Sequence, residues 1–179
     1  EYEFNSKNFH YPDSVKEIMY YAFSGCKSLT SIIIPKKVSS IGECAFNGCT
    51  SLVTAPELPA TKLEDSCYSF MFQSCTSLKE APELPATTLA SSCYYGMFKN
   101  CASLTTTPEL PATTLSNYCY QSMYHGCTSL TTTSELPSTK IEFNCYREMF
   151  NGCHKLTTAP ELPASTLKSM CYYGMFSGC

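Results

Sequence analysis

Seven cysteines divide most of this chain into units of nearly constant length. The seven are Cys26, Cys49, Cys75, Cys101, Cys127, Cys153 and Cys179. Their positions differ by 23 at the first step and by 26 at every later step. Each cysteine closes a similar phrase, of which CYYGMFKNC at 93–101 is an example. A repeat this regular predicts a solenoid, because a unit of this size buries its apolar face only by stacking on its neighbours.

Apolar residues recur at fixed places within the units. One column consists of Leu29, Leu52, Leu78, Leu104, Leu130 and Leu156. A second consists of Ile34, Leu58, Leu84, Leu110, Leu136 and Leu162. A third consists of Val15, Val38, Leu63, Leu89, Leu115, Ile141 and Leu167. A fourth consists of Phe23, Phe46, Phe72, Phe98, Tyr124, Phe150 and Phe176. Stacking turns each column into a ladder of side chains, so we expect these four columns to form the core.

Each unit combines an extended part with a part that has a four-residue spacing. The stretch 104–110 is rich in Thr and is followed by Pro111, which cannot donate to a strand ladder, so strands of three or four residues are expected there. Positions 89, 93, 97 and 101 are apolar or Cys, and this spacing predicts a helix of one or two turns. A Gly-rich column just after it favours a left-handed residue at the helix end. That column consists of Gly25, Gly48, Ser74, Asn100, Gly126, Gly152 and Gly178.

The phrases CKSLTSIIIP at 26–35 and AFNGC at 45–49 resemble the BspA-like leucine-rich-repeat family. The later units, with phrases such as APELPA at 81–86, resemble a variant that is common in surface proteins of anaerobic gut and oral bacteria. We therefore predict an α/β fold, a right-handed leucine-rich-repeat solenoid with one short parallel strand and one short helix or 3-10 turn per unit of 23–26 residues. The resemblance implies an exported protein, extracellular or on the outer cell surface, often lipid-anchored or multidomain. It also implies adhesion to host proteins for some members, and no catalytic residues.

The composition is compatible with one domain. The chain has 179 residues, 44% of them hydrophobic, which predicts a single solenoid of about seven units over 1–179. Its net charge of −3 provides no basic patch for nucleic acid or an anionic membrane. No apolar run approaches the roughly 20 residues that span a bilayer. Because the chain opens on Glu1 without a signal-peptide pattern and ends in mid-pattern, we expect it to be a segment of a longer protein.

The 13 cysteines follow the repeat. Seven lie in the column already described, and Cys44 stands alone. The other five are Cys67, Cys93, Cys119, Cys145 and Cys171. This second column aligns with Ile18 and Ile41, which favours buried free thiols that act as small apolar groups. Disulfides between neighbouring rungs are less favoured because the side chains run parallel, and a metal site is least favoured because Cys-x-x-Cys spacing is absent from the sequence.

No arrangement of residues in the sequence predicts catalysis. His10, His125 and His154 fall in different repeat positions, and none can be paired with a nucleophile from the sequence. The recurrent glycines fit turn positions rather than a phosphate-binding loop. We therefore expect no enzymatic activity and no cofactor.

Two columns are candidate binding surfaces. The first, here called the glutamate strip, is an acidic column that consists of Glu57, Glu83, Glu109, Glu135 and Glu161. It is interpreted as a solubilising stripe, with a cation site or a docking strip for a basic partner as alternatives. The second is an aromatic stripe that consists of Tyr68, Tyr94, Tyr120, Tyr146 and Tyr172. These tyrosines are expected to cover the core, with a partly exposed contact surface as the alternative.

The sequence therefore predicts a non-catalytic repeat protein that binds a host or bacterial surface protein or a glycan. The alternative is a structural spacer that holds a separate functional domain away from the cell. The identity of the ligand is not encoded in any motif of the sequence.

Overall fold

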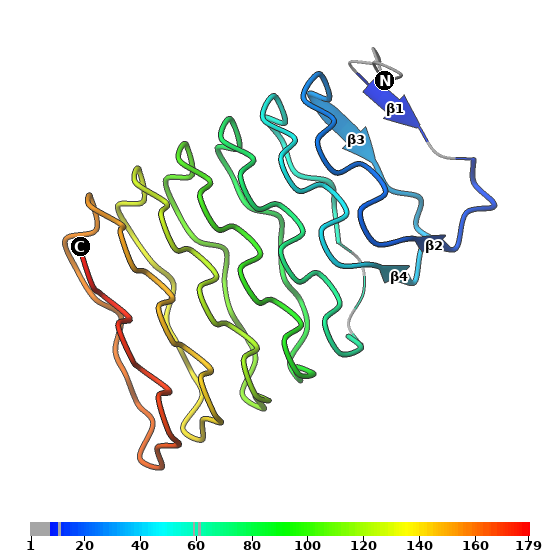
Figure 1. Ribbon diagram of the computed structural model, residues 1–179. Coiled ribbons are helices and arrows are strands. Elements are labelled where there is room, and N and C mark those ends of the chain that lie inside the picture. The colour runs from blue at the N-terminus through cyan, green and yellow to red at the C-terminus, as the bar shows by residue number, and fades with distance from the viewer. Residues whose placement is uncertain (1–7, 11, 59, 61) are drawn as a thin grey trace.

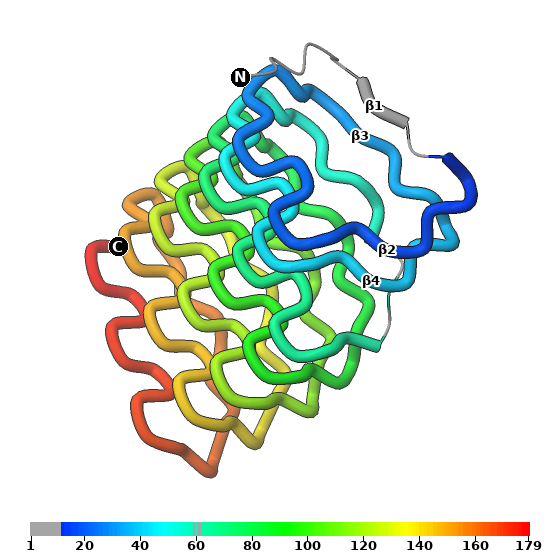
Figure 2. The backbone as a smooth tube through the Cα atoms, turned by 45° about the vertical axis from the view of Figure 1, so that its right-hand side comes forward, coloured from blue at the N-terminus to red at the C-terminus, as the bar shows by residue number. Residues whose placement is uncertain are grey.

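The computed structural model describes residues 8–10, 12–58, 60 and 62–179. Over these residues the chain winds into stacked coils that follow one another from the blue N-terminal end to the red C-terminal end (Figures 1 and 2). Equivalent parts of successive coils lie side by side, so the repeat in the sequence is also a repeat in space. No helix in the described part of the chain is long and apolar enough to cross a membrane.

The first two coils carry the four strands that occur in the described part of the chain. Strand β1 (Asn8–His10) pairs with β3 (Ser31–Ile33), and β2 (Glu17–Ile18) pairs with β4 (Ser40–Ile41). Both pairs are parallel, as the stacking of repeated units requires. The later coils are joined by single parallel bridges, namely Thr54↔Glu80, Thr88↔Thr114, Thr106↔Thr132 and Lys140↔Thr166.

The extended segments of the later coils are thus shorter than the strands of three or four residues that the sequence predicts. Prolines explain the difference. Pro56, Pro82 and Pro108 lie directly in this segment and have no N–H group to donate to the next coil. The parallel arrangement of the units is confirmed, but in the extended segments of the later coils the pairing is confined to single bridges.

The four predicted columns form the core. Phe72, Phe98 and Phe150 are at most 1% exposed, and the rings of this column stack with neighbouring centroids 5.5–5.8 Å apart. The leucine columns are buried beside them, although Val15 at the N-terminal end of the third column is only half-buried. The last coil differs, since Leu162 and Leu167 are 40% and 59% exposed. Both belong to buried columns, and they are exposed because they lie on the last coil that the structure describes.

Of the short helix or 3-10 turn predicted for each unit, no helix occurs among the described residues. Residues 91–100 form a series of tight turns instead. Left-handed residues recur there at every fourth position, with φ values of 57° at Ser92, 57° at Gly96 and 61° at Asn100. A left-handed residue cannot continue a right-handed helix, so the four-residue spacing that predicts a helix reflects a series of turns of similar period.

The hydrogen bonds of this segment explain why turns replace the helix. The Phe98 N–H donates to the Met123 carbonyl of the next coil, with an N···O distance of 2.9 Å. The Cys101 N–H instead donates back to the Phe98 carbonyl, at 3.0 Å. This alternation runs through the segment, so every second amide joins one coil to the next. The predicted left-handed residues are confirmed, because all seven residues of the Gly-rich column have φ between 59° and 75°.

Candidate binding surface

The glutamate strip lies on an extended part of each coil in which side chains alternate between inside and outside. In one coil Pro82, Leu84 and Ala86 are buried, whereas Glu83 and Pro85 are exposed. This alternation is the period of two that an extended backbone imposes. The apolar side chains anchor the segment in the core, and the glutamate between them therefore points outward. All five glutamates of the strip are exposed.

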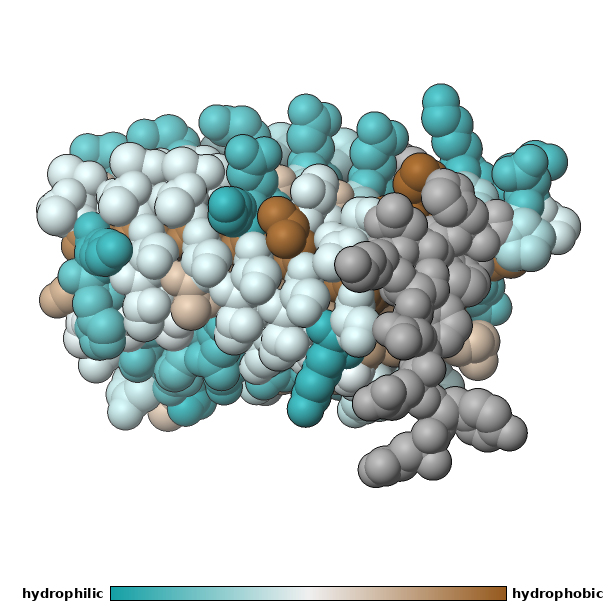
Figure 3. All heavy atoms as spheres, turned by 90° about the horizontal axis from the view of Figure 1, so that it is seen from above, coloured by the Kyte–Doolittle hydropathy of each residue, from teal (hydrophilic) through white to brown (hydrophobic). Residues whose placement is uncertain are grey.

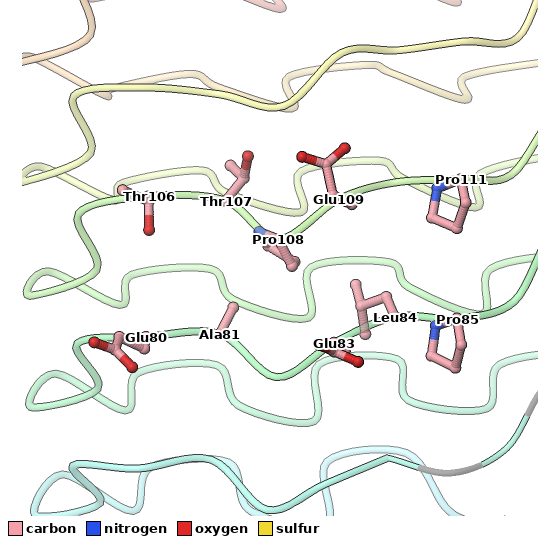
Figure 4. Close-up of a pocket in the computed structure, with 10 residues that line it drawn as sticks. All are labelled: Glu80, Ala81, Glu83, Leu84, Pro85, Thr106, Thr107, Pro108, Glu109 and Pro111. Carbon is pink, nitrogen blue, oxygen red and sulfur yellow. The ribbon is translucent and has the colours of Figure 1, made fainter.

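Two neighbouring cavities lie along this strip. The first has a volume of about 430 Å³ and is bordered by Glu83 and Glu109 of successive coils (Figure 4). The second, also about 430 Å³, lies between Glu57 and Glu83. Both are lined by Glu83 and Pro85, so they form one continuous hollow, here called the proline–glutamate groove. The equivalent prolines Pro85 and Pro111 border it on neighbouring coils (Figure 4).

Seen from above, the surface of the stacked coils is mostly hydrophilic or neutral, with only scattered hydrophobic side chains (Figure 3). This pattern agrees with the burial of the apolar columns inside the stack.

Sequence reasoning missed one acidic residue of the groove. Glu80 lines the first cavity together with Glu83 and Glu109. It replaces the threonine that stands at the same repeat position in Thr54, Thr106 and Thr132. This break in a threonine column was the signal available in the sequence, but only the stacking of coils places it beside the glutamate strip.

The carboxylates of the strip follow one another coil by coil and do not gather around a point. No group of three or more His, Cys, Asp or Glu side chains that could hold a metal ion occurs among the described residues. The single ion pair in that part of the chain joins Arg147 and Glu148, 3.4 Å apart, and involves no member of the strip. The arrangement therefore offers a row of unpaired negative charges along a shallow groove.

The aromatic column does not provide an exposed stripe over most of its length. Tyr68, Tyr94, Tyr120 and Tyr146 are at most 2% exposed, and only Tyr172 of the last coil is partly exposed. Their rings stack with centroids 5.6–6.1 Å apart. The expectation that these tyrosines cover the core is confirmed, and the alternative of a contact surface fails for the four buried rings because a partner cannot reach them.

The cysteine columns are also part of the core. All 13 cysteines are free, and 11 are buried. In the column that defines the repeat, six thiols donate to a backbone carbonyl of the preceding coil, with Sγ···O distances of 3.1–3.2 Å. These donors are Cys49, Cys75, Cys101, Cys127, Cys153 and Cys179. The thiols thus cap the carbonyls of the phenylalanine column that runs from Phe23 to Phe176, such as that of Phe72, which accepts from Cys101.

Burial keeps most of these thiols protonated. The pKa of Cys49 is raised from 9.0 to about 12, chiefly by removal of the thiol from water and to a smaller extent by the neighbouring Cys26, against an opposing backbone hydrogen bond. Burial likewise raises the pKa of Cys93 and Cys153 to about 12. The thiolate is the nucleophilic and metal-binding form, so these cysteines are poorly suited to catalysis at neutral pH.

Comparison with known proteins places this geometry in a family. The family model described as the BspA type leucine rich repeat region matches in six copies, over residues 1–124 and 69–179. The chain belongs to this family. Repeats of the BspA type generally serve interactions between proteins and are generally not enzymes. No curated protein matches the chain.

Several solved structures resemble the BspA-type chain. A leucine-rich cell surface protein of Faecalibacterium prausnitzii is 26% identical over 73% of the chain, with a TM-score of 0.53. A leucine-rich repeat protein of Bacteroides ovatus is 26% identical over 83% of the chain, with a TM-score of 0.57. One of Eubacterium ventriosum shares the fold over 97% of the chain at 22% identity, with a TM-score of 0.66. The chain covers 32%, 38% and 44% of these three proteins, respectively.

Proposed function

We propose that this chain is a non-catalytic binding module of an exported or cell-surface protein, and that it engages a protein or glycan partner through the proline–glutamate groove. The observation that carries the proposal is the continuous groove between Glu57 and Glu109, which repeats the same exposed side chains on successive coils. A partner that spans several coils meets the same chemistry on each, so its contacts add up along the stack.

The likeness to a leucine-rich cell surface protein of Faecalibacterium prausnitzii supports an outer-surface location for this chain. The burial of the tyrosine and cysteine columns supports a binding role for the proline–glutamate groove, because the buried side chains hold the coils together and cannot reach a partner. Successive coils with their exposed residues held in register also give a preorganised surface, which lowers the entropy lost when a partner binds.

A direct test is to screen the chain for binding to immobilised host matrix proteins and mucin glycans. Thr106→Tyr would fill the groove from an exposed lining position, and Thr105→Tyr would add the same ring at an exposed neighbouring residue outside the lining. We expect loss of binding with the first variant and retention with the second. Equal effects of both variants would place the binding surface elsewhere.

A structural spacer is the second candidate function. The observation that favours it is the stack of ring columns and inter-coil hydrogen bonds, which makes the coils a stiff unit. Absence of binding to any ligand of the screen, by a chain that is folded by circular dichroism, would favour the spacer over the binding module.

A further inference from the structure

The hydrogen-bonding character of the proline–glutamate groove is one-sided. Five of its lining residues are prolines, each with a carbonyl but without an N–H group, and they are Pro56, Pro82, Pro85, Pro108 and Pro111. Its charged lining residues are all acidic, namely Glu57, Glu80, Glu83 and Glu109. Ionised carboxylates only accept hydrogen bonds. The groove is therefore rich in acceptors, poor in donors and negatively charged.

The hydroxyls of Thr106 and Thr107 are the only side-chain donors among the described lining residues. The Oγ1 atom of Thr107 already accepts the backbone N–H of Ser134 at 2.6 Å. Among the described residues, none of the four groove carboxylates takes part in an ion pair. An acidic surface without internal cations attracts positively charged partners and repels anionic ones, such as sulfated or sialylated glycans.

The prolines also limit how a partner can bind. A partner strand added to a sheet edge needs alternating N–H and C=O groups along that edge. The groove runs across successive coils and is not a sheet edge, and its prolines offer carbonyls without N–H donors, so side chains that carry several donors match this lining best. Lysine ammonium and arginine guanidinium groups have three and five N–H donors, respectively, and no acceptors.

From this complementarity we propose that the groove binds an extended polypeptide segment that carries lysine or arginine side chains, laid across the coils. This inference rests on the proposed binding function and names the partner class. Parallel rungs are spaced by about 4.8 Å, so alternate carboxylates of the strip are about 9.6 Å apart along the stack. A polyproline II segment advances about 9.3 Å per three residues, so a basic residue at every third position meets every second coil.

The test uses the whole 179-residue chain and fluorescent twelve-residue peptides. The probe repeats Lys-Pro-Pro four times, and the control peptide repeats Glu-Pro-Pro. Fluorescence anisotropy at low salt should detect binding of the lysine peptide, weakening as NaCl is raised to about 0.5 M because salt screens exposed charges. The glutamate peptide should not bind. A control with the same four lysines at a shorter spacing, Lys-Ser repeated four times and followed by four serines, should bind more weakly.

A matched pair of variants separates groove contacts from overall charge. Glu83→Gln with Glu109→Gln removes two groove carboxylates and should weaken binding about tenfold. Glu43→Gln with Glu64→Gln changes net charge equally at a separate cavity, beside Tyr20 and Tyr21, and should leave the affinity nearly unchanged. Equal weakening by both double variants, or no binding of the lysine peptide, would overturn the proposal.

Failure of this inference is distinguishable from failure of the binding function. Suppose that a ligand of the screen binds the chain, is blocked by Thr106→Tyr, and is insensitive to salt and to the two groove Gln substitutions. The groove would then be a binding site, but not one for basic segments. If Thr106→Tyr has no more effect than Thr105→Tyr on any ligand, the groove itself is not a binding site.

Discussion

Tyr124 interrupts a column of phenylalanines, and its replacement by phenylalanine provides a test of the core. Its ring stacks between Phe98 and Phe150, with both centroids 5.6 Å away and interplanar angles of 6° and 4°. The side chain is fully buried, and its hydroxyl has no hydrogen-bond partner in the part of the chain that the structure describes. The hydroxyl thus loses its water without a replacement.

Tyr124→Phe removes this hydroxyl and keeps the stacked ring. A buried polar group without a partner costs about 1–3 kcal/mol, so we expect the free energy of unfolding to rise by about 1–2 kcal/mol. For a chain of this length, each kcal/mol raises Tm by about 2–4 °C. Thermal and urea unfolding followed by circular dichroism would measure the change. The reverse substitution, Phe98→Tyr, places a hydroxyl in the same column and should destabilise by a similar amount.

A second control comes from the tyrosine column. The hydroxyl of Tyr146 is not among the buried atoms that lack a partner, although its ring is 1% exposed. Tyr146→Phe should therefore give no comparable stabilisation. If Tyr124→Phe leaves Tm unchanged or lowers it, the hydroxyl of Tyr124 makes a hydrogen bond in solution, and the assignment of a dry, unpartnered group is refuted.

Three further predictions concern charges and thiols. Thiol titration without reductant should find few reactive groups in the native chain and nearly all 13 after unfolding, and fewer than about ten after unfolding would indicate disulfides. Stability should fall above pH 9, because buried thiols such as Cys49 and Cys153 have pKa values raised from 9.0 to about 12 and only the unfolded chain releases their protons between these limits. By this linkage each such thiol lowers the free energy of unfolding by about 1.4 kcal/mol at pH 10. A constant Tm from pH 8 to pH 10 would contradict the burial of the thiols. Finally, Glu109→Gln with Glu135→Gln should raise Tm at low salt by relieving repulsion of about 0.8 kcal/mol per neighbouring pair, with the gain lost in high NaCl. A stabilisation of the parent chain specific to Ca²⁺, absent from this double variant, would instead support a cation site on the strip.

Sequence reasoning succeeded for the core because the repeat is regular. The same kind of side chain returns to the same place in every coil, so the burial of Phe98 follows from its column and not from its local neighbours. The sequence leaves open whether the tyrosine column is buried or exposed. Tyr94 carries both a large apolar ring and a hydroxyl, and its position next to a cysteine column did not settle whether it faces inward or outward.

The local conformation of the turn segment was less accessible. Positions 93, 97 and 101 share a spacing that a helix and a series of four-residue turns both produce. Asn100 and the glycines of its column indicated a left-handed residue, but Ser92 has no such preference and is nevertheless left-handed. It adopts this conformation because its N–H donates to the Asn117 carbonyl of the next coil, 3.0 Å away. That partner is remote in the sequence and becomes available only when the coils stack.

The sequence by itself determined that the units repeat, which side chains point inward, and that Glu83 and Glu109 occupy the same column. These properties depend on the alternation along an extended segment and on the constant length of the repeat unit. Both can be recognised in the amino-acid sequence. Only the tertiary structure decided that the glutamates border a groove with Pro85 and Pro111, and that Glu80 joins them. A groove depends on the distance between neighbouring coils and on which backbone groups remain unpaired, and both are set by how the units pack rather than by the order of residues within one unit.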